Sequence, residues 1–159
     1  MPEVVSNTGP LIALAQVRQI ELLRHLFGMV VLPPAVRVEA QDELTASALT
    51  GADWLVSRAP QDAFAVRLLQ ETLGAGESEA IVLAQEVSAD WLLLDDLAAR
   101  RKAEAVGLRV VGTLGPLLMG KLAGHIPAVK PVLDELRQAH FHMSAELSAL
   151  VLQQAHEAE

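Results

Sequence analysis

Two neighbouring aspartates, Asp95 and Asp96, follow the apolar run "WLLL" of residues 91–94. A run of this kind predicts a strand that is buried on both faces, as in the middle of a parallel sheet. Two adjacent carboxylates at the end of such a strand are unfavourable unless a cation neutralises them. Mg²⁺ and Mn²⁺ fit that role, because hard divalent cations prefer oxygen ligands. Alternatively, one of the two aspartates only caps the helix predicted over residues 97–106.

Other polar residues stand where they could join this pair. In an open α/β sheet, ligands bind at the carboxyl ends of the strands, so residues that follow a strand or begin a helix there are candidates. Each also has an ordinary structural role, because acids suit the first turn of a helix and a helical glutamate is usually exposed. The candidates are Ser6, Asn7 and Thr8 after a strand predicted over 3–7, Glu39 in a helix that starts at Pro34, and Glu77 and Glu79 at the start of a helix over 79–89.

The composition removes several other kinds of chemistry. The 159-residue chain has no cysteine, which excludes disulfides, thiolate zinc sites, iron–sulfur clusters and cysteine nucleophiles. Hydrophobic residues make up 52% of the chain, but there are only 3 Phe, 2 Trp and no Tyr. The core is therefore aliphatic, and an RNA reader built on stacked aromatic residues is not expected. No signal peptide opens the chain and no apolar run is long enough to span a membrane, so we expect a cytoplasmic protein.

The net charge of −8 argues at first against a nucleic-acid partner, but the charge is unevenly distributed. Residues 97–142 carry seven Lys and Arg against three Asp and Glu, whereas residues 1–96 carry five against fourteen. An acidic body with one basic stretch can hold a metal ion and still offer a face to phosphates, although ordinary scatter of surface charge accounts for the same numbers. Arg100, Arg101 and Lys102 lie about one turn beyond the aspartates and are the candidate nucleic-acid contacts; Arg100 could instead pair with one of the acids.

Short apolar strands alternate with helical patterns along the chain. This alternation predicts the α/β class, with a parallel sheet and helices on both of its faces. Thr8 is expected to cap the helix after the first strand, and residues 53–60 fit an edge strand. Two amphipathic helices after about residue 126 are expected to be an addition to this body. We therefore expect a single domain over residues 1–159 with a C-terminal helical addition.

Four segments of the chain resemble, in order and spacing, the PIN-domain family. The segments are "VVSNTGPLIALA", "VVLPPAVRVEA", "GAGESEAIVLA" and "LLLDDLAARRKAEAVGLRVVGTLGPLL". They are most similar to an uncharacterised prokaryotic branch with GE-x-EAI and DD-x-AAR signatures, whose better-known relatives are the VapC-type toxins of toxin–antitoxin pairs. The resemblance covers roughly residues 4–150. It implies a PIN-like three-layer α/β/α sandwich with a central parallel sheet of four to five strands and extra C-terminal helices.

The resemblance also implies a metal-dependent ribonuclease, in which carboxylates gather around Mg²⁺ or Mn²⁺ and RNA phosphodiester bonds are hydrolysed. In such an enzyme the metal lowers the pKa of a bound water and neutralises charge on the transition state. The family's catalytic positions fall on Asn7, Glu39, Glu79 and Asp96, its metal ligands on Glu39, Glu77, Glu79, Asp95 and Asp96, and its accessory hydroxyls on Ser6 and Thr8.

The first of these positions departs from the family pattern. Most PIN domains have an aspartate where this chain has Asn7, whose amide offers one neutral oxygen in place of a carboxylate. A divalent ion would lose one unit of nearby negative charge. Two functions therefore remain open: an endoribonuclease, with the toxin of a toxin–antitoxin pair as one form, and an inactive PIN-fold module that binds nucleic acid or protein. A receiver-like phosphoacceptor fits less well, because receiver domains carry their aspartate pair after the first strand.

The same resemblance leads to the expected partners. RNA is the expected substrate, and an antitoxin protein is a further candidate partner. Dimerisation through helices is common in the family, so a homodimer is expected. The apolar stripes of the last two predicted helices do not decide this, because such stripes usually pack on a domain's own core.

Overall fold

Five short strands form one parallel sheet in the computed structural model, which describes residues 2–157. The spatial order is β3-β2-β1-β4-β5, so β1 is central and pairs with β2 and β4. The backbone N–H of Asn7 extends the β1–β4 ladder by donating to the carbonyl of Leu93 at 2.9 Å. The strands are β1 (Val4–Ser6), β2 (Val30–Leu32), β3 (Leu55–Ser57), β4 (Trp91–Leu93) and β5 (Val110–Val111).

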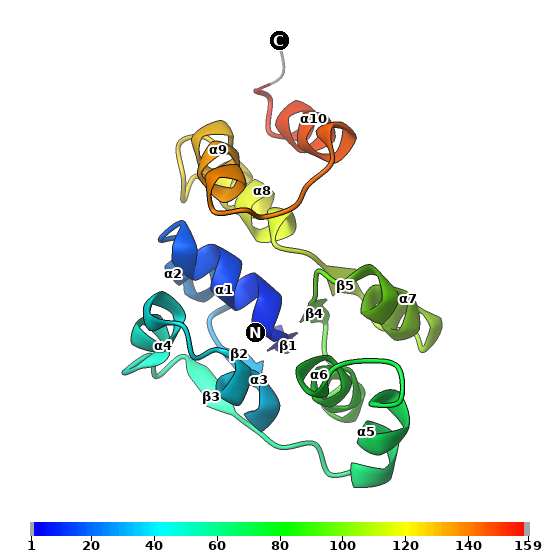
Figure 1. Cartoon of the computed structure of the whole chain (residues 1–159). Helices are drawn as coiled ribbons and strands as arrows, with labels where there is room; N and C mark the ends of the chain where they lie inside the picture. Colours follow the sequence, from blue (N-terminus) through cyan, green and yellow to red (C-terminus); the bar gives the residue numbers. More distant parts are fainter. Residues whose placement is uncertain (1, 158–159) are drawn as a thin grey trace.

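Helices cover both faces of this sheet, and α8, α9 and α10 gather beyond α1 and α2 (Figure 1). This arrangement confirms the α/β/α sandwich with five parallel strands that the sequence predicts. The helices are α1 (Thr8–Gln16), α2 (Glu21–Phe27), α3 (Pro34–Glu39), α4 (Glu43–Leu49), α5 (Ala63–Leu69), α6 (Ala75–Glu86), α7 (Leu97–Ala105), α8 (Leu114–Leu122), α9 (Lys130–Gln138) and α10 (Ala145–Gln154).

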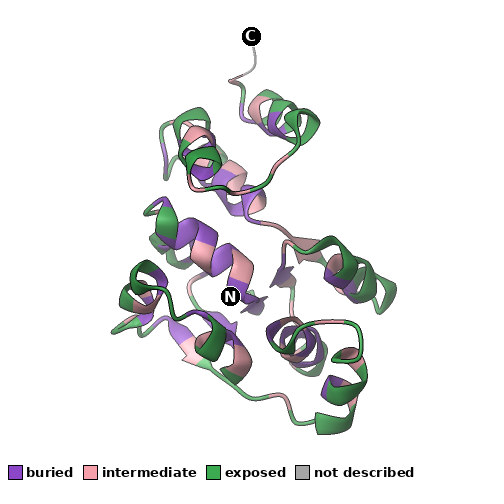
Figure 2. Cartoon of the chain, in the orientation of Figure 1, coloured by how far each residue is buried: buried purple, intermediate pink, exposed green. Residues whose placement is uncertain are grey.

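Each face of the sheet has its own apolar core, because successive strand residues point to opposite sides. On β1, Val4 packs into a core shared with α1, α2, α8 and α9, whereas Val5 packs into a core shared with α6 and α7. Both valines are fully buried, as a central parallel strand requires. Figure 2 shows that buried residues concentrate in the strands and on the inward sides of the helices.

The carboxyl ends of β1 and β4 lie next to each other, since Ser6 is in register with Leu93. After β1 the chain adds β2 and β3 on one side of it, and it then adds β4 and β5 on the other side. The gap between β1 and β4 is therefore the point where the strand order reverses, and this is where open α/β sheets bind ligands. Asn7 leaves β1 at this point, and Asp95 follows β4 there.

The strands agree with the sequence expectations, but three helix boundaries differ. The helix expected to run on from Pro34 ends at Glu39, and a second helix starts after Asp42, whose carboxylate accepts a hydrogen bond from the N–H of Thr45 at 3.1 Å. The helix expected from residue 79 starts at Ala75. Thr8 was expected to cap α1, yet the N-cap position belongs to Asn7 and the hydroxyl of Thr8 bonds elsewhere.

Glu157, which follows α10, links the end of the chain to α8 and α9. Its carboxylate accepts hydrogen bonds from the N–H groups of Val129 and Lys130, at 2.7 and 3.0 Å, and from the ammonium of Lys121 at 3.0 Å. Burial acts to raise the pKa of Glu157, but these hydrogen bonds and the charge of Lys121 together lower that pKa below its usual range. Among residues 2–157, no helix is long and apolar enough to cross a membrane.

Candidate functional site at the carboxyl edge of the sheet

Asn7 places an amide oxygen inside the protein without a hydrogen-bond donor. The residue occupies the N-cap position of α1 and is only 6% exposed. Its Oδ1 atom is buried, and no donor within residues 2–157 reaches it. Buried polar atoms nearly always have a partner, so an oxygen of this kind marks a place where a cation or water belongs.

Glu39, the last residue of α3, lies beside that oxygen. The hydroxyl of Thr8 donates to Glu39 Oε1 at 2.6 Å, and the backbone N–H of Gly76 donates to Oε2 at 3.1 Å. A Cβ atom at position 76 would overlap the Glu39 carboxylate and would lie 3.1 Å from Asn7 Oδ1. The close approach of these groups therefore depends on a glycine at the second residue of α6. We call Asn7, Thr8, Glu39 and Gly76 the Glu39 side of the edge.

Two glutamates link α3 and α6 in opposite directions. Glu39 binds the N–H of Gly76 in the first turn of α6, where the helix dipole favours a negative charge. In return, Glu79 of α6 accepts a hydrogen bond from the N–H of Ala35, in the first turn of α3, at 3.0 Å. Both candidate ligands therefore also satisfy helix-terminal N–H groups that have no partner within their own helix.

Asp95 lies on the other side of the N-terminus of α1. Its Oδ1 accepts a hydrogen bond from the N–H of Thr113, and its Oδ2 accepts one from the hydroxyl of the same threonine, both at 2.7 Å. A Cβ atom at Gly9 would lie 3.4 Å from Asp95 Oδ2, so this carboxylate packs against the first turn of α1. We call Gly9, Asp95, Gly112 and Thr113 the Asp95 side of the edge. The two sides meet at α1, because Asn7 and Gly9 are two residues apart.

Arg100 points to the Asp95 side without forming the ion pair that we considered from the sequence. A Cβ atom at Gly112 would lie 2.9 Å from Asp95 Oδ1 and 3.1 Å from Arg100 Nη1, so both side chains border the same small space. Even so, Arg100 has no carboxylate within 4.0 Å among the described residues. Arg100 is half-buried as a residue, whereas the neighbouring Arg101 and Lys102 are exposed on α7.

The remaining candidates have local structural roles. Asp96 is the N-cap of α7 and accepts a hydrogen bond from the N–H of Ala99 at 2.9 Å, which is the capping role considered from the sequence. Glu77 accepts a hydrogen bond from the N–H of Gly74 at 3.0 Å, which closes the first turn of α6. The Ser6 hydroxyl is fully buried and donates to the carbonyl of Asn7 at 2.9 Å.

The structure thus brings some of the predicted site residues together. Asn7, Thr8 and Glu39 converge, and Asp95 lies close by across the first turn of α1. Within residues 2–157, no three Asp, Glu or His side chains converge tightly enough to hold a metal ion by themselves. This does not conflict with a Mg²⁺ site, because Mg²⁺ usually keeps several waters and takes only one or two carboxylates from the protein.

Sequence reasoning missed two residues that shape the edge. Gly76 leaves room for Glu39 and Asn7, and Thr113 satisfies both oxygens of Asp95. The signal for both was small residues just before predicted helices, "GAG" at residues 74–76 and "GT" at residues 112–113. A small residue at the start of a helix lets an anionic side chain reach the backbone N–H groups.

Comparison with known proteins supplies the family. No curated protein matches this chain. A family model described as a PIN domain matches residues 3–157, which is nearly the whole sequence. Together with the five-stranded parallel sheet, this match shows that the chain belongs to the PIN-domain family.

Proposed function

We propose that this chain is a divalent-metal-dependent ribonuclease that hydrolyses RNA phosphodiester bonds at the carboxyl edge of its sheet. Membership in the PIN family, a nuclease-type fold, supports this reaction class. The observation that carries the proposal is the buried Asn7 Oδ1, which lacks a donor and lies beside the carboxylate of Glu39. Two hard oxygen donors at the strand-order reversal are what Mg²⁺ or Mn²⁺ binds.

The chain's own residues would divide the work as follows. Asn7 Oδ1 and Glu39 hold the ion from the end of β1 and of α3, and Thr8 orients the Glu39 carboxylate through its hydroxyl. Asp96, Glu77 and Glu79 are the further proposed ligands, since each has one carboxylate oxygen without a protein donor among the described residues. When bound, the metal supplies an activated water and offsets negative charge on the phosphate.

The experiment that tests this proposal combines Mn²⁺ titration calorimetry with RNA cleavage. We expect wild-type protein to bind Mn²⁺ and to cleave single-stranded RNA in Mn²⁺ but not in EDTA. Glu39→Gln keeps an oxygen acceptor for the Gly76 N–H, so it should fold, yet its Mn²⁺ affinity should fall at least about tenfold. Glu104→Gln, an exposed acid on α7, is the matched control. Unchanged Mn²⁺ binding by Glu39→Gln would count against the site.

The same residues also support a second function, a PIN fold that binds nucleic acid or protein without cleaving RNA. The five candidate acids each accept a hydrogen bond from a backbone N–H, and position 7 carries a neutral amide. A PIN fold that binds without cleaving would keep these hydrogen bonds. Retained RNA binding with no detectable Mn²⁺ binding by calorimetry would select this function. An antitoxin and a second copy of the chain are the partners that the family resemblance adds to either function.

A further inference from the structure

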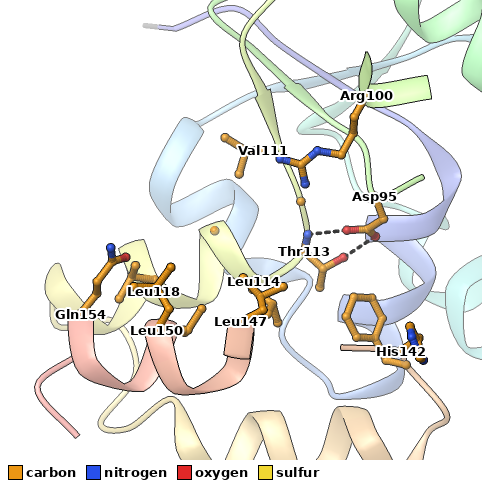
Figure 3. A pocket seen from close by; sticks show the side chains of 14 residues that line it. Asp95, Arg100, Val111, Thr113, Leu114, Leu118, His142, Leu147, Leu150 and Gln154 are labelled. Carbon is orange, nitrogen blue, oxygen red and sulfur yellow. Dashed lines mark hydrogen bonds between the residues drawn. The ribbon is translucent and has the colours of Figure 1, made fainter. Parts of the chain in front are cut away.

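A cavity of about 350 Å³ lies between the end of β5, α8 and α10, next to the Asp95 side (Figure 3). Its size falls within the range of small-ligand sites, roughly 300–1,000 Å³. Asp95 and Arg100 stand at one end of it, and Leu118 and Leu150 line the other end. The cavity is therefore polar and charged where it meets the candidate site, and apolar farther away.

Arg100 is a cationic group in this lining that has no partner among residues 2–157. Residues 2–157 contain two half-buried arginines. Arg37 donates to the hydroxyl of Ser57 and to the carbonyl of Leu55, whereas Arg100 makes no hydrogen bond or ion pair with the described residues. A guanidinium at a cavity wall with no protein acceptor presents a fork of N–H donors, which suits a phosphate or carboxylate from outside the chain.

Asp95 lies close to Arg100 but does not supply the missing acceptor. Both of its oxygens already accept hydrogen bonds from Thr113, and it lies more than 4.0 Å from the guanidinium nitrogens. Thr113 is fully buried, so its hydrogen bonds are protected from water. Asp95 therefore offsets part of the charge of Arg100 at a distance, but it leaves the N–H groups of the guanidinium free to bind an acceptor.

The apolar end of the cavity defines the rest of the ligand. Leu147 and Leu150 of α10 line this end and are 44% and 48% exposed, so the cavity opens to the surface along α10. Phe141 adds an aromatic ring to the same lining. A nucleotide fits these two ends, with its phosphate at Arg100 and one face of its base against the apolar side chains. Bases stack on aromatic rings irrespective of their sequence.

We propose that this cavity binds one nucleotide of a single-stranded RNA, with its phosphate at Arg100 and its base between α8 and α10. The inference rests on RNA being the substrate, as proposed above, and it adds the place where the strand is held. Asp95 lines the cavity and packs against the first turn of α1, which carries Asn7 at its N-cap, so the cavity adjoins the candidate site.

The test measures RNA binding in EDTA, where metal-dependent cleavage cannot occur. The probe is a fluorescein-labelled, ten-nucleotide single-stranded RNA, and the readout is fluorescence anisotropy of the full chain. Arg100→Gln removes the phosphate contact, and Leu150→Trp fills the apolar end. Each should raise the Kd about tenfold, the loss expected for one charge-assisted contact or one stacked base.

Two matched variants control for charge and bulk. Arg18→Gln removes one positive charge beyond the opposite end of α1, and Leu122→Trp enlarges an exposed residue of α8 outside the cavity lining. Both should change the Kd by less than about threefold, the size of a general electrostatic effect. A wild type that does not bind RNA, or equal losses in test and control variants, would overturn the nucleotide site.

Cleavage in Mn²⁺ by the same variants separates this inference from the proposed function. If the wild type cleaves and Arg100→Gln and Leu150→Trp bind and cleave equally well, the ribonuclease stands and the nucleotide site is wrong. If RNA binds through the cavity but no variant cleaves, the nucleotide site stands and the ribonuclease is wrong. If Leu150→Trp changes only the sedimentation of the protein, the cavity is a contact between copies and the proposal fails.

Discussion

The Glu39 side and the Asp95 side of the sheet edge hold their carboxylates in the same way but have opposite surroundings. Each acid accepts one threonine hydroxyl and one backbone N–H: Glu39 from Thr8 and Gly76, and Asp95 from Thr113 alone. Beside Glu39 there is an acceptor without a donor, whereas beside Asp95 there is a guanidinium without an acceptor. Surplus acceptors attract a cation, and surplus donors attract an anion.

This difference shows that two carboxylates held by the same kinds of donor can have different roles, because the groups around them differ. A phosphodiester bound at the edge would need both properties at once, with a cation on one side and a positive group for the neighbouring phosphate on the other. The two sides meet at the N-terminus of α1, where Asn7 belongs to the Glu39 side and Gly9 belongs to the Asp95 side. Substitutions on one side alone, and at Glu157 away from both sides, test this difference.

Asn7→Asp should have the largest effect. A carboxylate in place of the buried amide would lie beside Glu39 without a donor, so unfolding in EDTA should show a loss of roughly 2 kcal/mol or more. Mn²⁺ should remove much of this penalty, and its affinity should rise about tenfold because one negative charge is added. Urea unfolding with and without Mn²⁺ measures both effects. A variant as stable in EDTA as in Mn²⁺ would show that Asn7 does not face the ion.

Gly76→Ala should affect both stability and ion binding. Its Cβ would displace the end of the exposed Glu39 side chain, and loss of the hydrogen bonds from Thr8 and Gly76 should cost about 1–3 kcal/mol. Displacing Glu39 from Asn7 should also weaken Mn²⁺ binding in calorimetry. Gly74→Ala is the control, since its Cβ would lie at an ordinary 3.4 Å from Glu77 Oε1. Equal Mn²⁺ affinity in both variants would separate Gly76 from the ion site.

Thr113→Val and Thr8→Val compare the two hydroxyls directly. Thr113→Val leaves a half-buried oxygen of Asp95 without its hydroxyl donor and should cost about 1–3 kcal/mol in urea unfolding. Thr8→Val should cost less, about 0.5–1 kcal/mol, because Glu39 is exposed to water. Only Thr8→Val should lower Mn²⁺ affinity. A loss of Mn²⁺ affinity in Thr113→Val but not in Thr8→Val would instead indicate that the ion binds on the Asp95 side.

Substitution of Glu157 should have the smallest effect. This carboxylate differs from those of both sides, because it is paired with a cation as well as with N–H groups. These contacts lower the pKa of Glu157, so its contribution to stability is present above the ordinary glutamate pKa and is lost as pH falls through the lowered value. Between about pH 5 and pH 3, the wild type should lose more stability than Glu157→Gln. Parallel losses in thermal melts would contradict this.

The strands and their ends were predictable, because each is a very short apolar run between polar or turn residues, and that length favours a buried strand over a helix. "VVS" before Asn7 and "WLLL" before Asp95 both formed strands whose carboxyl ends meet. Helix boundaries were harder to predict, since they depend on side chains that bond to N–H groups of other segments. Asp42 starts a new helix and thereby makes Glu39 a helix-terminal residue.

The environment of each site residue was not predictable, because it depends on contacts between distant segments. The sequence placed Arg100 next to the aspartates, and only the structure shows that Thr113, thirteen residues later, already satisfies Asp95. Likewise, the missing donor of Asn7 depends on how α1 and α6 approach each other at Gly76.

The crossed glutamates of α3 and α6 also affect how sequences related to this one are interpreted. Replacement of Glu39 would release the first turn of α6 as well as remove an ion ligand, and replacement of Glu79 would release the first turn of α3. A descendant that had lost all enzymatic activity would still gain stability from an acceptor at both positions, because each satisfies N–H groups at a helix terminus. Glutamate at these two positions therefore does not by itself indicate a working nuclease.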